Sequence, residues 1–308
     1  MGHDPLVKLC ELVLAFIVIL ISRHKEKRWS VGMRNFVMLS LCVLSILSTA
    51  LKPVSAEAFD INDPIQIETF LSKLYAQPNT IKQVTKSFGV SAEKEIIVTQ
   101  HLKALLLNPK LINAMSREMV SQGVLDNVQN KNSANAAGTA FGYQFVTQLT
   151  VDGIKRLPDE RVLEYIEFVD RFFDLIEPRH CRALMGSAAK QKDEIEASFA
   201  AIRNMSASEL RAYFVLNREA VNAELNDWPI VINLNDYEIK TATAAFEKSF
   251  AKKLGAHPFS STITTALTDA SNAQDKDFCI AGKFVMATIS ELGGMAGNWF
   301  RRSFVLSL

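Results

Sequence analysis

The stretch PDERVLEYIEFVDRFFDLIEP, residues 158–178, decides the fold class. Its apolar side chains return every three or four residues, which is the spacing of one face of an α-helix. This face consists of Leu163, Ile166, Phe173 and Ile176. A proline stands at each end, where a helix tolerates it in the first turn or stops before it. The stretch therefore predicts one long amphipathic helix.

The same apolar spacing recurs along the chain, and most of the segments that show it begin or end with a helix start or stop signal. The start signals are Asp63 with Pro64, Asn108 with Pro109, and the pair Ser206 and Glu209, which forms a capping box. Glycines are expected to end three helices, at Gly123, Gly255 and Gly293. Only PIVINL, residues 229–234, alternates like a strand. Because one short strand builds no sheet, we expect an extended connector there. We predict an all-α, multi-helix globular domain of about ten helices.

Two polar segments contain the residues that favour loops, at 126–135 and at 226–236. Neither is long enough for a flexible linker between domains. We therefore expect one helical domain over residues 57–308. The alternative is an N-terminal subdomain with a boundary near 126–135.

Residues 33–60, MRNFVMLSLCVLSILSTALKPVSAEAFD, have the order of parts found in a secretory signal. A basic residue comes first, residues 36–51 are apolar, and small side chains at Val54 and Ala56 precede a cut before Glu57. We expect residues 33–56 to be a signal peptide. The alternative is an uncleaved membrane anchor, although the run is short for spanning a bilayer.

A second apolar run, LVLAFIVILIS at residues 12–22, is about half as long as a spanning helix requires. We read residues 1–32 as an upstream extension, with translation beginning at Met33. The alternative is a membrane hairpin whose basic connector, residues 23–28, stays in the cytoplasm.

The chain holds 34 Lys and Arg against 33 Asp and Glu, and four cysteines. Such a balance argues against a nucleic-acid partner, which normally needs an excess of positive charge. Loss of the signal removes Cys10 and Cys42 and leaves Cys181 and Cys279 alone in an oxidising compartment, where we expect them to form a disulfide. The alternative is two buried free thiols.

No catalytic or metal-binding pattern emerges from the residue types that carry such chemistry. The histidines beyond the signal, His101, His180 and His257, are far apart, whereas zinc ligands usually stand a few residues apart. We expect no metal site and no cofactor. The densest acidic set is Glu160, Glu164, Glu167, Asp170 and Asp174. On a helix these acids form a face that usually serves only to interact with solvent.

These observations favour an exported helical binding or scaffolding protein of the bacterial envelope, periplasmic or secreted, whose partner is another envelope protein. An immunity-type partner of a toxin is one form of this. One alternative is a hydrolase of the cell wall or of peptides, built from scattered acids, which requires two buried and converging carboxylates. The other is a component anchored to the inner membrane. Membrane contact is expected only before Glu57 or through the C-terminal tail, residues 299–308, which we expect to dock on the protein body.

Overall fold

The computed structural model describes residues 60–126, 131–185 and 191–308. The expected extension, the signal peptide and its cleavage residues Val54, Ala56 and Glu57 lie outside these ranges. The predicted all-α class is confirmed, because the described ranges hold thirteen helices and no strand. The helices are α4 (Pro64–Tyr75), α5 (Pro78–Ser87), α6 (Ala92–Leu106), α7 (Pro109–Ser121), α8 (Lys131–Ile154), α9 (Asp159–Leu175), α10 (Pro178–Met185), α11 (Gln191–Asn204), α12 (Ala207–Leu225), α13 (Asp236–Ala256), α14 (Ser260–Thr268), α15 (Asp275–Ser290) and α16 (Gly294–Leu306).

The predicted helix starts are confirmed by their hydrogen bonds. The Asp63 carboxylate accepts the Ile65 amide at 2.9 Å, and Asn108 caps α7 in the same way. At α12, the Ser206 hydroxyl accepts the Glu209 amide at 3.2 Å, while the Glu209 carboxylate accepts the Ser206 amide at 2.7 Å. Each cap satisfies an amide that the first turn leaves without a helical partner.

Two predicted ends differ from the structure. Gly255 does not end its helix, because α13 continues through it to Ala256. The stop comes from Pro258, which disfavours the helical conformation of the residue before it, so His257 is extended. The expected end at Gly293 is a junction instead: α15 stops at Ser290, and the tail after Gly293 forms a further helix, α16.

The described chain divides into two compact units. Unit 1 consists of residues 154–204 and 229–308, and unit 2 of residues 60–153 and 205–228. The chain thus passes between the units three times, whereas the described residues of the segment 126–135 lie within unit 2. The physical reason is α12, whose apolar side chains pack against α6 and α7 although α9 to α11 precede it in sequence.

In unit 2, α4 packs against α7, α5 against α6, and α12 against α6. The core contains fully buried apolar side chains from each of these helices, among them Leu71, Val84, Val98, Leu102, Met115 and Phe214. α8 joins this core at Gly153, where an added Cβ would stand 1.8 Å from the carbonyl oxygen of Ala220. Only glycine therefore lets the backbones of α8 and α12 approach this closely.

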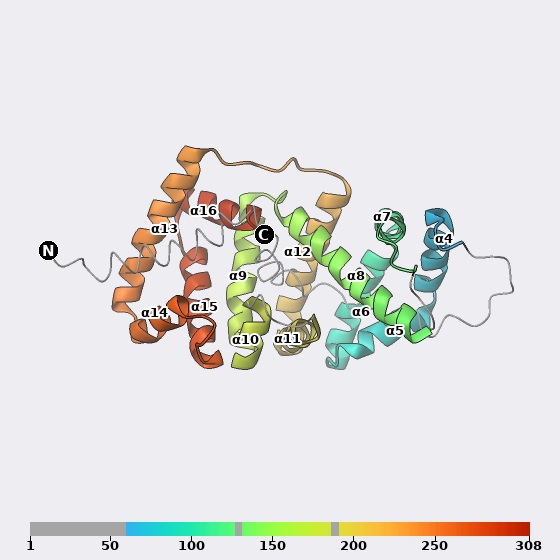
Figure 1. Cartoon of the computed structure of the whole chain (residues 1–308), viewed down its shortest axis with the longest axis horizontal. Coiled ribbons are helices and arrows are strands. Elements are labelled where there is room, and N and C mark those ends of the chain that lie inside the picture. The colour runs from blue at the N-terminus through green and yellow to red at the C-terminus, as the bar shows by residue number, and fades with distance from the viewer. Residues whose placement is uncertain (1–59, 127–130, 186–190) are drawn as a thin grey trace. The chain divides into compact units, whose positions relative to one another are not determined.

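In unit 1, α15 lies between α13 and α9, and α16 runs across the ends of α15 and α9 (Figure 1). The face predicted for residues 158–178 is broader than expected, since Tyr165, Val169 and Phe172 are also buried, while Leu163 is half-buried. Phe246 of α13 stacks on Phe300 of α16 with ring centroids 4.2 Å apart.

None of the described helices combines the length and the apolar character that crossing a membrane requires.

Replacing Gly153 with alanine should destabilise the protein by about 2 kcal/mol or more, because the new methyl group overlaps the Ala220 carbonyl and pushes α8 away from α12. The matched control is Gly255→Ala in α13, where nothing lies within 4 Å of an added Cβ. That change should stabilise the protein by up to about 1 kcal/mol through helix propensity. Urea unfolding of the two variants measures both effects, and equal stability of the two would contradict the close approach.

Candidate functional site

The three histidines stand on different elements of the structure. His101 lies in α6 of unit 2, whereas His180 lies in α10 and His257 follows α13, both in unit 1. Within the described ranges, no group of three His, Cys, Asp or Glu side chains is placed to hold a metal ion.

His101 is buried in the core of unit 2. Its ring stacks on Phe214 with centroids 3.9 Å apart and planes 6° apart. Its Nδ1 lies 3.2 Å from a guanidinium nitrogen of Arg218, which only donates, so Nδ1 accepts and the ring proton sits on Nε2. Burial, helped by the Arg218 charge, holds the pKa of His101 well below its ordinary value. The imidazole is thus a neutral core group with its basic nitrogen already engaged.

Among the five acids of α9, Asp170 has the least ordinary surroundings. Its side chain is half-buried, and its Oδ1 is buried without a hydrogen-bond partner. Burial raises the pKa of Asp170 to about 6, with smaller opposing effects of Lys283, which lowers it, and Asp174, which raises it. The sequence did not distinguish Asp170 from its neighbours, because its burial depends on the packing of α9 against α15.

The other four acids do not form a second buried carboxylate beside Asp170. Glu160 and Glu167 are exposed, and Glu164 pairs with Arg161 one turn away. Asp174 pairs with Lys283 of α15 at the surface. The arrangement expected for a hydrolase, two buried and converging carboxylates, is therefore not met by this set.

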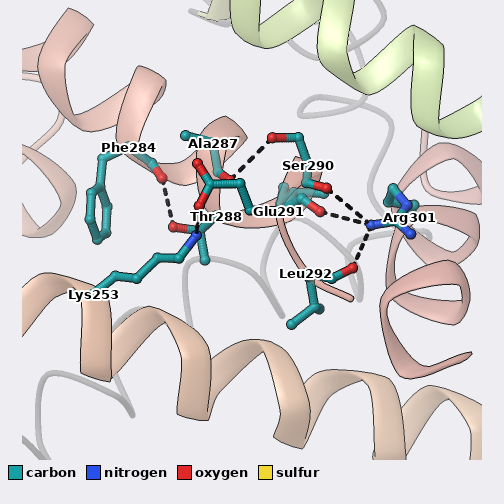
Figure 2. A network of polar contacts seen from close by, with 9 residues as sticks. Lys253, Phe284, Ala287, Thr288, Ser290, Glu291, Leu292 and Arg301 are labelled. Carbon is teal, nitrogen blue, oxygen red and sulfur yellow. Dashed lines mark hydrogen bonds and ion pairs between the residues drawn. The ribbon is translucent and has the colours of Figure 1, made fainter. Parts of the chain in front are cut away.

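Arg301 of α16 is buried, and its side chain caps the C-terminus of α15. The sequence did not predict this role. One guanidinium nitrogen donates to the carbonyl oxygens of Ile289 at 3.2 Å and Leu292 at 2.7 Å, and lies 3.4 Å from that of Ser290 (Figure 2). The last carbonyls of a helix have no full set of partners within it, and a cation at a helix C-terminus is also favoured by the helix dipole. Lys253 of α13 pairs with Glu291 at 2.5 Å in the same network.

Arg302, the next residue, is buried in a different direction. It donates to the Asp159 carboxylate and, at 3.1 Å, to the carbonyl oxygen of Lys155. These partners stand at the start of α9 and just before it. The C-terminal tail therefore docks on unit 1 through two buried arginines, with Phe300 and Val305 packed beside them.

Cys181 of α10 and Cys279 of α15 lie at disulfide distance, with their Cα atoms 5.3 Å apart. The predicted proximity of these two cysteines is confirmed. Arg182 joins the same two regions, because it pairs with Asp275 at 2.9 Å and donates to the carbonyl oxygens of Ala270 and Ala273. The side chain also covers the ring of Phe278 at 4.7 Å.

Exposed apolar side chains stand on the segment before α13 and in the first turn of that helix. Ile230, Ile232 and Tyr237 are 70%, 52% and 72% exposed, and we call these three residues the connector surface. The Tyr237 ring has an edge contact with Trp299 of α16, with centroids 6.5 Å apart, so it stands on the body of unit 1. An apolar group of this kind, exposed close together along the chain, is typical of an interaction site.

No known family model, curated protein or solved structure matches this chain.

Replacing Arg301 with methionine should destabilise the protein by about 2–4 kcal/mol, because the end of α15 loses its charged donor and its carbonyls stay buried. The matched control is Arg171→Met on α9, whose half-exposed side chain lies 3.4 Å from Asp174 and should cost about 0.5 kcal/mol or less. Thermal and urea unfolding compare the two. Similar losses for both variants would show that Arg301 is not the cap of α15.

Asp170→Asn should stabilise the protein at pH 7.5 but not at pH 4.5. The folded pKa of about 6 stands above the ordinary value of 3.8, so ionisation costs more in the folded state and wild-type stability falls as pH rises through this window. Half exposure reduces the gain to about 1 kcal/mol. Unfolding free energies at both pH values test this, with exposed Glu167→Gln as control. A gain that is the same at both pH values would contradict the assignment.

Proposed function

We propose that this chain is an exported helical binding protein of the bacterial envelope, which engages another envelope protein through the connector surface. The observation that carries the proposal is the exposure of Ile230 and Ile232 before α13 and of Tyr237 in its first turn, all in unit 1. Burying large apolar side chains against a partner is the main favourable term in protein association. An immunity-type role, in which the partner is a toxin, is one form of this function.

Binding is better supported than catalysis by what surrounds the reactive side chains. His101 is a neutral core group, Cys181 lies at disulfide distance from Cys279, and Asp170 has no second buried acid among its α9 neighbours. A hydrolase of the cell wall or of peptides remains the alternative function, with Asp170 as its one acid of raised pKa.

The proposed location is periplasmic or secreted, and the alternative is anchorage to the inner membrane. The signal-like order of residues 33–56 supports export. Mass spectrometry of the protein from the envelope fraction should find an N-terminus at Glu57, or at Phe59 if cleavage uses the neighbouring small residue Ala58. Recovery of a chain that begins at Met1 or Met33 would favour the anchored alternative.

Export also implies that Cys181 and Cys279 are oxidised in the cell. Denatured but unreduced protein should then take up no alkylating reagent at these positions, and reduced protein should take up two equivalents. Cys181→Ser is the control, because it leaves Cys279 free to react. The bridge closes a loop with a sequence separation of 98, so reduction should lower stability by at most about 4–5 kcal/mol. Two reactive thiols without reduction would support the alternative of buried free cysteines.

The binding proposal is tested by paired variants of exposed isoleucines. Ile230→Ser with Ile232→Ser removes most of the connector surface, whereas Ile65→Ser with Ile96→Ser removes isoleucines of similar exposure, 71% and 61%, from unit 2. A partner that co-purifies in stoichiometric amount with wild type should stay with the second pair. It should bind the first pair at least about tenfold more weakly. Equal retention by both pairs would refute the connector surface as the binding site.

A further inference from the structure

The outward face of α13 carries three lysines, Lys240, Lys248 and Lys252, which we call the lysine face. At about 3.6 residues per turn, these three side chains fall within about a third of the helix circumference, and all are exposed. The opposite third is the buried side of the helix and consists of Ala242, Phe246, Phe250 and Leu254. Figure 1 shows α13 at an outer edge of unit 1, with α15 and α16 on its inner side.

No carboxylate neutralises the lysine face. Within the described ranges, none of its three ammonium groups has an ion-pair partner, whereas other lysines of unit 1 do: Lys253 pairs with Glu291, and Lys283 pairs with Asp174. The acids of α13 lie outside the third of the helix that holds the lysines, and they are Asp236, Glu238 and Glu247. The face therefore presents three positive charges to its surroundings.

The spacing of these lysines is unfavourable as long as the face has no partner. Lys248 and Lys252 are four residues apart on one helix, where like charges repel each other and destabilise the helix. Proteins break a local rule of this kind mainly where function requires it. A negatively charged partner would remove the repulsion.

The composition of the face indicates a lipid surface rather than a protein as that partner. Protein interfaces are enriched in arginine and aromatic residues and depleted in lysine. The residues between the lysines on this face are small, namely Thr241, Ala244 and Ala251, so no large side chain is available to fill a pocket of a partner protein. A lysine ammonium is a point charge on a flexible stem, which suits phosphate headgroups that have no fixed arrangement.

We infer that α13 binds with its lysine face to an anionic phospholipid surface and so holds unit 1 at a membrane that the helix does not cross. Each lysine near such a surface strengthens binding about fivefold, so three lysines strengthen it on the order of a hundredfold. The inference goes beyond the proposed function and uses residues other than the connector surface. The sequence did not predict this contact, because lysines also stand on ordinary solvated helix faces.

Flotation of the full chain with vesicles tests the inference. The vesicles consist of phosphatidylcholine alone or of equal parts of phosphatidylcholine and phosphatidylglycerol, at lipid concentrations below saturation. Wild type should bind the anionic vesicles more tightly and lose this difference at high salt. The triple variant Lys240→Gln, Lys248→Gln and Lys252→Gln should bind the anionic vesicles at least about thirtyfold more weakly. Arginine at the same three positions should keep binding within about threefold, because the charge remains.

The matched control replaces three exposed lysines of unit 2 with glutamine, at Lys73, Lys82 and Lys86. This variant has the same net charge as the α13 variant, and its binding should stay within about threefold of wild type. Binding through the residues before Glu57 is common to all variants, so the comparison between variants isolates α13.

Two further measurements separate binding from folding. The α13 glutamine variant should melt at no lower temperature than wild type, because it loses the repulsion between Lys248 and Lys252. Acetylation of wild type, followed by mass spectrometry, should show that anionic vesicles protect the lysine face, whereas Lys82 and Lys86 stay reactive.

Equal losses in the two glutamine variants would overturn the inference, because net charge alone would then explain binding. Equal binding of wild type to both kinds of vesicle, or no binding to either, would overturn it as well. So would loss of a co-purifying protein from the α13 variant with vesicle binding unchanged, since the face would then bind an acidic protein. The connector surface is judged separately, because Ile230→Ser with Ile232→Ser should leave vesicle binding unchanged.

Discussion

Unit 1 depends on how the last helix places two neighbouring arginines in the protein interior. The side chains of Arg301 and Arg302 leave α16 in different directions, one toward the end of α15 and the other toward the start of α9. Burying a guanidinium is costly unless its donors find acceptors. Burial lowers the pKa of Arg301, and the carbonyls at the end of α15 and the side-chain oxygen of Asn298 provide acceptors for its two terminal nitrogens, whereas its Nε is buried without a hydrogen-bond partner. Gly297 permits this arrangement, since an added Cβ would stand 1.9 Å from the Leu292 carbonyl oxygen.

Local signals were readable from the sequence, and signals that depend on distant contacts were not. Asp63, Asn108 and the pair of Ser206 and Glu209 cap helices within a few residues of themselves, so their roles follow from spacing alone. The signal that ends α13 is also local, but it comes from Pro258 and not from Gly255, which lies within the helix. Arg302 and Asp159 are far apart in sequence, and no pattern along the chain indicates that they meet.

The candidate site shows the same division. Residues 229–234 were expected to be an extended connector, which follows from alternation too short for a sheet. The exposure of Ile230 and Ile232 could not be predicted without the structure, because the same alternating sequence is equally typical of a buried strand. The pairing of Cys181 with Cys279 could be predicted, because no other cysteine follows the expected signal. The raised pKa of Asp170 could not be predicted, because it depends on which helix covers its side chain. Segments between helices often carry function, because the helices fix their ends and leave their main chain accessible.

The order in which the chain is made has a consequence for its quality control. α12 covers α6 and α7, but it is synthesised only after α9, α10 and α11. Until that helix emerges, the nascent chain presents apolar side chains such as Val98 and Leu102 without their final cover. Exposed surface of this kind binds chaperones and promotes aggregation. Products truncated between Ile154 and Asn204 lack α12 altogether, so we expect them to keep this surface exposed and to aggregate, whereas a chain that includes α12 buries it.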